Sequence, residues 1–75
     1  MVSADVIIDK LKAQMPSAQI KAVDMTGGGD HWQVTIRAAE FKGKTLVEQH
    51  QMVYRALGDM MSGPIHALAL DTKEI

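Results

Sequence analysis

Apolar residues at the start of the chain recur at the spacing of a helix. Ser3 is suited to cap this helix at its N terminus, Asp5 lies in its first turn, and Pro16 ends it. We therefore predict an amphipathic helix over residues 4–15, with one face directed toward a core. Its apolar stripe consists of Ala4, Ile7, Ile8, Leu11 and Met15.

A second, longer helix is predicted to begin after residue 45. Residues 45–48 (TLVE) form a capping-box sequence, in which Thr45 caps the helix and Glu48 reaches back to the cap. Residues 62–64 (SGP) supply a glycine cap and a proline stop at the other end. The predicted apolar line of this helix contains Leu46, Val53, Leu57, Met60 and Met61.

Three segments have the pattern of strands. In residues 31–37 (HWQVTIR), large apolar residues alternate with polar ones, which is typical of a half-buried strand. Residues 18–25 are rich in Ile and Val, and residues 65–70 (IHALAL) are almost wholly apolar, so we predict strands there too. The remaining segments are predicted as a glycine-rich loop (26–30, TGGGD), a turn (38–44) and a short polar tail (71–75).

The order of these elements determines the predicted topology. The short loop makes the first two strands antiparallel, whereas the helix between the second and third strands makes them parallel through a right-handed crossover. The predicted fold class is therefore α/β with the order α-β-β-α-β, a three-stranded mixed sheet with its helices on one face. A chain of 75 residues builds one modest core, so we expect a single small domain.

Composition excludes several classes of function. The chain has no cysteine, so it provides no thiolate nucleophile and no thiolate metal site of its own. Eight lysines and arginines against nine aspartates and glutamates give a net charge of −1, without the basic surplus typical of nucleic-acid-binding domains. We find no nucleophile motif and no paired carboxylates, and we predict that the protein is not an enzyme. No signal-peptide pattern is present, so a cytoplasmic location is expected.

Two histidines lie at the starts of the predicted parallel strands. Because such strands start at the same end of a sheet and lie about 4.8 Å apart, His31 and His66 would be roughly 5 to 8 Å apart. That distance allows both to reach a shared metal ion or cluster. Residue parity argues against this arrangement, because His66 shares the parity of Leu68 whereas His31 alternates with Trp32. The side chains then point to different faces unless the loop redirects His31.

Each histidine also has a purely structural interpretation. By residue type alone, His66 is more often a strand-end histidine with one nitrogen bound to a carbonyl than a ligand. His31 is most simply an exposed surface residue, and His50 lies at a packing position of the second helix. Residues 27–30 (GGGD) precede a strand and not a helix, so we interpret them as a mobile turn and not as a phosphate-binding loop.

Three motifs occur in order along the second half of the chain. They are the turn F-K-G-K from Phe41, the helix V-E-Q-H-Q-M-V-Y from Val47 and the strand I-H-A-L from Ile65. Together with G-D-H-W-Q-V upstream, these motifs and their spacing resemble the BolA-like family. The resemblance covers nearly the whole chain, so we expect one BolA-like domain over residues 1–75.

The resemblance implies a fold similar to class II KH domains and a non-enzymatic role. Members of the family form heterodimers with monothiol glutaredoxins and often share a [2Fe-2S] cluster with the glutaredoxin and its glutathione, so no cofactor is expected in the isolated chain. The family's cluster ligand at the start of the last strand matches His66. A second ligand usually comes from a cysteine or histidine in the loop between the first two strands, where this chain has GGGD (27–30). Either His31 substitutes, or the second ligand is absent.

The implied function is iron-sulfur trafficking or iron and redox sensing, and two alternatives stay open. The family's KH-like fold has been linked to transcriptional regulation, which would require nucleic-acid binding. KH domains, however, clamp the nucleic-acid backbone with a G-x-x-G loop between helices, whereas here the glycines lie between strands and Asp30 stands where the last glycine would be. The other alternative is an interaction module that binds the glutaredoxin without any cluster.

Overall fold

The computed structural model describes residues 2–75, so Met1 of the expected domain lies outside the described residues. Within these residues, two α-helices, three strands and two short 3-10 helices follow one another along the chain. The predicted small α/β domain with a three-stranded mixed sheet is confirmed. The elements are α1 (Ala4–Gln14), β1 (Gln19–Asp24), β2 (His31–Ala38), η1 (Ala39–Phe41), α2 (Leu46–Leu57), η2 (Gly58–Ser62) and β3 (Ala67–Glu74).

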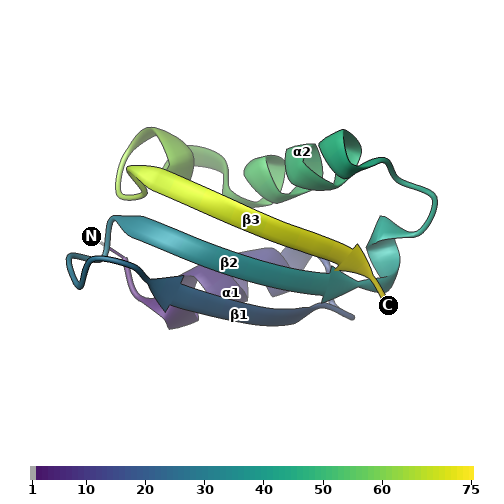
Figure 1. Cartoon of the computed structure of the whole chain (residues 1–75), viewed down its shortest axis with the longest axis horizontal. Helices are drawn as coiled ribbons and strands as arrows, with labels where there is room; N and C mark the ends of the chain where they lie inside the picture. The colour runs from purple at the N-terminus through teal and green to yellow at the C-terminus, as the bar shows by residue number, and fades with distance from the viewer. Residues whose placement is uncertain (1) are drawn as a thin grey trace.

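The central strand of the sheet is β2, with β1 on one side and β3 on the other (Figure 1). β1 pairs with β2 antiparallel across the glycine-rich loop, and β3 pairs with β2 parallel after the crossover through α2. The register places Ala22 beside Val34 and Val34 beside Leu70, so these residues share one face of the sheet. The parallel strands β2 and β3 therefore start at the same end.

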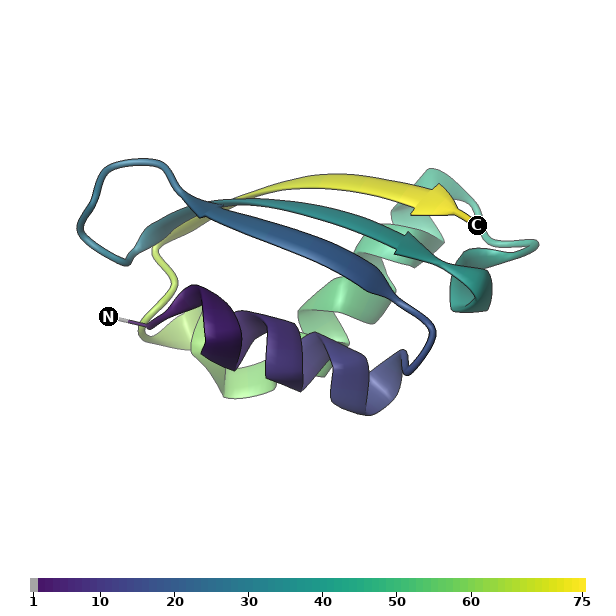
Figure 2. The same cartoon turned by 90° about the horizontal axis from the view of Figure 1, so that it is seen from below.

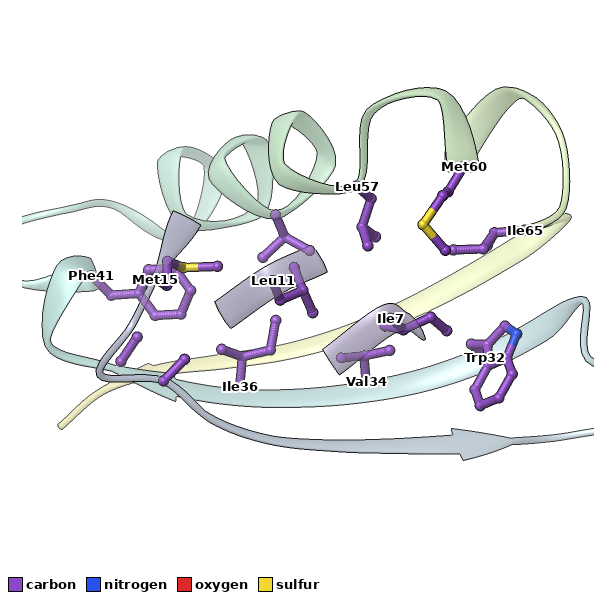
Figure 3. Packing of buried hydrophobic residues seen from close by; sticks show 13 residues of the cluster. Ile7, Leu11, Met15, Trp32, Val34, Ile36, Phe41, Leu57, Met60 and Ile65 are labelled. Atoms are coloured by element: carbon purple, nitrogen blue, oxygen red, sulfur yellow. The ribbon is translucent and has the colours of Figure 1, made fainter. Parts of the chain in front are cut away.

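Both helices cover the same face of the sheet (Figure 2). Alternate residues of β2 point toward the helices, and they meet apolar side chains from both helices and from the connecting segments. Figure 3 shows this cluster between the helices and the sheet. Its buried members are Ile7, Leu11, Met15, Ala18, Trp32, Val34, Ile36, Ala38, Phe41, Val53, Leu57, Met60 and Ile65.

Both helices begin where the capping residues predict. The Ser3 hydroxyl accepts a hydrogen bond from the N–H of Val6 at 3.4 Å. In α2, Thr45 Oγ1 accepts from the N–H of Glu48 at 3.2 Å and Glu48 Oε1 accepts from the N–H of Thr45 at 2.9 Å, which confirms the capping box. Of the helices in residues 2–75, none has the length and apolar content needed to cross a membrane.

The α-helix α2 ends earlier than predicted. Gly58 has a φ of 55°, which a continuing α-helix cannot accommodate, and the chain proceeds to Ser62 as the 3-10 helix η2. The predicted stop at residues 62–64 is therefore wrong for the α-helix. Leu46 was also predicted on the apolar line but is 60% exposed. It is the first residue of α2, and helix side chains lean toward the N terminus, so Leu46 lies off the end of the packed face.

The last strand is displaced toward the C terminus relative to the prediction. It begins at Ala67, because Ile65 turns into the core before the strand starts, and it includes most of the predicted polar tail. Thr72 faces the helices and is 6% exposed, whereas the neighbouring Asp71 and Lys73 are exposed. The predicted turn over residues 38–44 also contains more structure than expected, because η1 places Phe41 in the core.

Candidate metal-ligand site

The two predicted site histidines lie side by side at one end of the sheet. The ring centroids of His31 and His66 are 5.7 Å apart, and the ring planes are inclined by 37°. His31 is paired in register with Ala67, so His66 lies just outside the strand. There the pleat of the sheet no longer fixes the direction of the side chain. The expectation from residue parity, that the two histidines point apart, is therefore wrong.

Asp30 contacts both histidine segments. Its carboxylate Oδ1 lies 3.0 Å from Nδ1 of His31. Its main-chain carbonyl accepts hydrogen bonds from the N–H of His66 at 2.7 Å and from the N–H of Ala67 at 3.1 Å. The hydrogen bond to His31 lowers the pKa of the Asp30 carboxyl below its ordinary value, because it favours the charged form. Sequence reasoning missed this role, since an aspartate beside a histidine is a weak signal by itself.

The glycine-rich loop is held by a second aspartate. The carboxylate of Asp24 accepts hydrogen bonds from the N–H groups of Thr26 (3.2 Å), Gly27 (3.0 Å) and Gly29 (2.8 Å). Gly27 and Gly29 have φ values of 81° and 75°, which glycine adopts without steric cost. An aspartate that bonds the backbone of a following turn is a recognisable pattern, and it could have indicated that this loop is organised.

Both imidazole rings are accessible from outside the molecule. His66 is exposed, and the side chain of His31 retains 41% of its accessible surface. Within residues 2–75, the His31–Asp30 contact is the only hydrogen bond made by either ring. A nitrogen on each ring therefore remains free to bind a ligand.

Other ligand candidates are not gathered at this site. Among residues 2–75, no group of three or more His, Cys, Asp or Glu side chains is arranged to hold a metal ion. His50 is half-buried on α2, as its packing interpretation predicts, and its Nε2 is buried without a hydrogen-bond partner in the described part of the chain. The candidate site thus consists of His31 and His66, with Asp30 between them.

Comparison with known proteins identifies the family. The family model for BolA-like protein matches residues 4–74. The protein RP812 of Rickettsia prowazekii (strain Madrid E) is 34% identical over 74 residues, which are 99% of this chain and 96% of that protein. The DNA-binding transcriptional regulator BolA of Escherichia coli (strain K12) is 29% identical over 82 residues, covering 100% of this chain and 78% of that protein.

A solved structure leads to the same family. The BolA protein homologue from Coxiella burnetii superposes with a TM-score of 0.82 at 29% identity, covering 99% of this chain and 92% of that one. The fold, the position of the motifs and the sequence similarity agree over nearly the whole length. The chain belongs to the BolA-like family.

Proposed function

We propose that this protein is a non-enzymatic partner of a monothiol glutaredoxin and that His66 and His31 bind a [2Fe-2S] cluster shared by the two proteins. The observation that carries the proposal is the pair of accessible imidazoles at one end of the sheet, with ring centroids 5.7 Å apart. The family resemblance implies the glutaredoxin partner and the kind of cluster. The geometry supplies two candidate ligands in this particular chain.

The separation of the rings fits two ligands on one iron atom. Two imidazoles that bind one metal atom tetrahedrally through nitrogens at about 2.1 Å have ring centroids roughly 5 Å apart. The separation of 5.7 Å in this structure is close to that value, and His66 is exposed. Paired histidines on one iron of a [2Fe-2S] cluster are an established arrangement, as in Rieske centres.

The remaining ligands would come from the partner. This chain has no cysteine, whereas the glutaredoxin cysteine and its bound glutathione provide the thiolates for the rest of the cluster. Replacing thiolates with neutral imidazoles makes a cluster less negative and raises its reduction potential. A cluster held in this way differs in potential from one held by thiolates alone, which suits a role in iron-sulfur trafficking or in iron and redox sensing.

Mixing the protein with a cluster-loaded monothiol glutaredoxin tests the proposal. We expect a heterodimer whose visible absorption and circular dichroism differ from those of the glutaredoxin homodimer. His66→Ala should abolish this spectral difference. His31→Ala should make the difference smaller and weaken retention of the cluster, because only the imidazole of His66 then remains at the site. His50→Gln changes the remaining histidine, outside the site, and should leave the spectrum unchanged.

The outcomes separate the ligand roles from the interaction. A His66→Ala spectrum equal to that of the wild type would show that His66 is not a ligand, and the same result for His31→Ala would exclude His31. Size-exclusion chromatography with cluster-free glutaredoxin completes the test. The heterodimer could form without the cluster, and its spectrum with the cluster could be the same in both variants as in the wild type. These two results together would favour an interaction module that binds no cluster.

Two observations favour a second candidate function, the binding of nucleic acid. The relative from E. coli carries the name of a DNA-binding transcriptional regulator. In addition, Arg37 and Lys73 are neighbours in register, and both are exposed. The net charge of −1 opposes this function. Binding to duplex DNA that weakens steeply with salt, with a slope reduced by about 1 in Lys73→Ala, would support it, and a flat salt dependence would exclude it.

A further inference from the structure

The contact between Asp30 and His31 determines which ring nitrogen of His31 carries a proton. Asp30, whose side chain is 44% exposed, is a carboxylate at neutral pH, and a carboxylate only accepts hydrogen bonds. Since Asp30 Oδ1 lies 3.0 Å from Nδ1 of His31, Nδ1 of the neutral ring must be the N–H donor. The other nitrogen, Nε2, then has a free lone pair.

We propose that Asp30 is a positioning residue that holds His31 in the Nδ1–H tautomer and leaves Nε2 as the nitrogen that binds iron. The first half of this proposal concerns the isolated chain alone, and the second half rests on the proposed function. Histidines that bind metals commonly donate their other ring N–H to a carboxylate, which orients the ring and makes the ligating nitrogen more basic. The contact between Asp30 Oδ1 and His31 Nδ1 has this arrangement.

The proposed tautomer is not the one that histidine adopts by default. In water, neutral histidine side chains favour the Nε2–H form, in which Nδ1 has the free lone pair. The hydrogen bond that Nδ1–H of His31 donates to the Asp30 carboxylate reverses this preference. The Thr26 hydroxyl also donates to Asp30 Oδ1, but this hydrogen bond is long, at 3.4 Å, so it contributes little to the position of the carboxylate.

Asp30 also contributes to the position of His66, through its main chain. Its carbonyl accepts the N–H groups of His66 and Ala67, at 2.7 Å and 3.1 Å. One residue therefore holds His31 by its side chain and the backbone of His66 by its carbonyl. Because every substitution keeps that carbonyl, a change of the Asp30 side chain tests its effect on His31 without removing the contact that places His66.

Nuclear magnetic resonance of the isolated protein tests the tautomer directly. With ¹⁵N-labelled histidine rings and at a pH where the imidazoles are neutral, two-bond and three-bond ¹⁵N–¹H correlations distinguish the two forms. We expect the Nδ1–H pattern for His31 in the wild type, the Nε2–H pattern in Asp30→Ala and a mixture in Asp30→Asn. Thr26→Ala changes the same loop but keeps the carboxylate, so it should retain the Nδ1–H pattern.

A second measurement uses the heterodimer with cluster-loaded glutaredoxin. We expect Asp30→Ala to raise the reduction potential of the cluster relative to the wild type, because His31 then lacks the carboxylate that makes its ligating nitrogen more basic. Thr26→Ala should leave the potential unchanged. An Nε2–H pattern for His31 in the wild type would overturn the proposal whatever the glutaredoxin experiment gives.

The two measurements fail independently. Suppose that Asp30→Ala abolishes the Nδ1–H pattern but leaves the reduction potential unchanged. This result would confirm that Asp30 sets the tautomer of His31, and it would overturn the role of Asp30 in iron binding. If His66→Ala and His31→Ala also leave the heterodimer spectrum unchanged, the proposed function itself is wrong. If those two variants alter the spectrum and Asp30→Ala does not alter the potential, only the assignment of Asp30 is wrong.

Discussion

Gly29 connects the glycine-rich loop to the buried Trp32, the residue that follows His31. Its φ of 75° lies in the left-handed region, and its carbonyl accepts the buried indole N–H of Trp32 at 3.0 Å. Gly29→Ala should lower the free energy of unfolding by about 1–2 kcal/mol, the cost of holding an L-residue in that conformation. Urea denaturation followed by circular dichroism measures this loss.

Gly28→Ala provides the matched control for that prediction. Gly28 lacks a positive φ, and an added Cβ would meet only the ends of the Asp30 and Thr26 side chains, at 3.1 and 3.4 Å. Both contacts are with side-chain ends and not with the backbone, so the loss of stability should be smaller than for Gly29→Ala. Equal losses for the two variants would contradict the strain argument.

The pairing of His31 with His66 was predictable from the sequence, but the role of Asp30 was not. Strand order and direction follow from the lengths of the connections, and these placed both histidines at one end of the sheet. The contact between Asp30 and His31 depends on the conformation of the loop, which Asp24 and the positive-φ glycines determine together. The prediction from residue parity was wrong for His66, because His66 precedes the paired residues of β3 and the alternation of the sheet does not fix the direction of its side chain.

The capping box of α2 should contribute more to stability than the single cap of α1. Thr45 and Glu48 exchange two hydrogen bonds, at 3.2 and 2.9 Å, whereas Ser3 accepts one at 3.4 Å. Thr45→Ala is therefore expected to lower the free energy of unfolding by about 1 kcal/mol, and Ser3→Ala by less. Urea denaturation of both variants checks this, and a loss for Ser3→Ala as large as that for Thr45→Ala would argue against it.

The ends of the elements were harder to predict than their existence. Gly58 lies within an apolar pattern that continues to Met60, so nothing local distinguishes a tolerated glycine from one with a φ of 55° that ends the helix. Likewise, the sequence of the second half of β3 is polar and predicts a tail. It forms a strand because β2 is eight residues long and offers hydrogen-bonding partners as far as Ala38. The length of β3 therefore depends on contacts that are distant in the sequence.

At the scale of the whole molecule, the core holds the candidate site in place. Each site histidine is next to a deeply buried residue, since Trp32 is 3% exposed and follows His31, and Ile65 is 2% exposed and precedes His66. Figure 3 shows Trp32 and Ile65 at the same end of the core. Two accessible rings are thereby attached to a packed interior, which limits how far they separate.

Three carboxylates in different parts of the molecule make its stability depend on pH in the acid range. Hydrogen bonds lower the pKa of Asp30 (from His31), of Glu40 (from Ser17) and of Glu48 (from the backbone N–H of Thr45) below the ordinary values of 3.8 for Asp and 4.5 for Glu. The folded protein therefore binds fewer protons in acid than the unfolded chain does. Their contribution is complete above the ordinary values and is lost as the pH falls through the lowered ones.

We therefore expect the free energy of unfolding to decrease steadily between about pH 5 and about pH 3, with little change attributable to these groups above that range. Urea denaturation across this interval measures the slope. Glu40→Gln should make the dependence of the free energy of unfolding on pH less steep, because the variant removes one of the three carboxylates. The Glu40 carboxylate accepts hydrogen bonds from the N–H and the hydroxyl of Ser17, which connects η1 to the segment after α1. Asp9→Asn provides the control, since Asp9 is exposed at the surface of α1. A slope that Glu40→Gln and Asp9→Asn change equally would mean that general charge, and not the contact between Ser17 and Glu40, sets the response to acid.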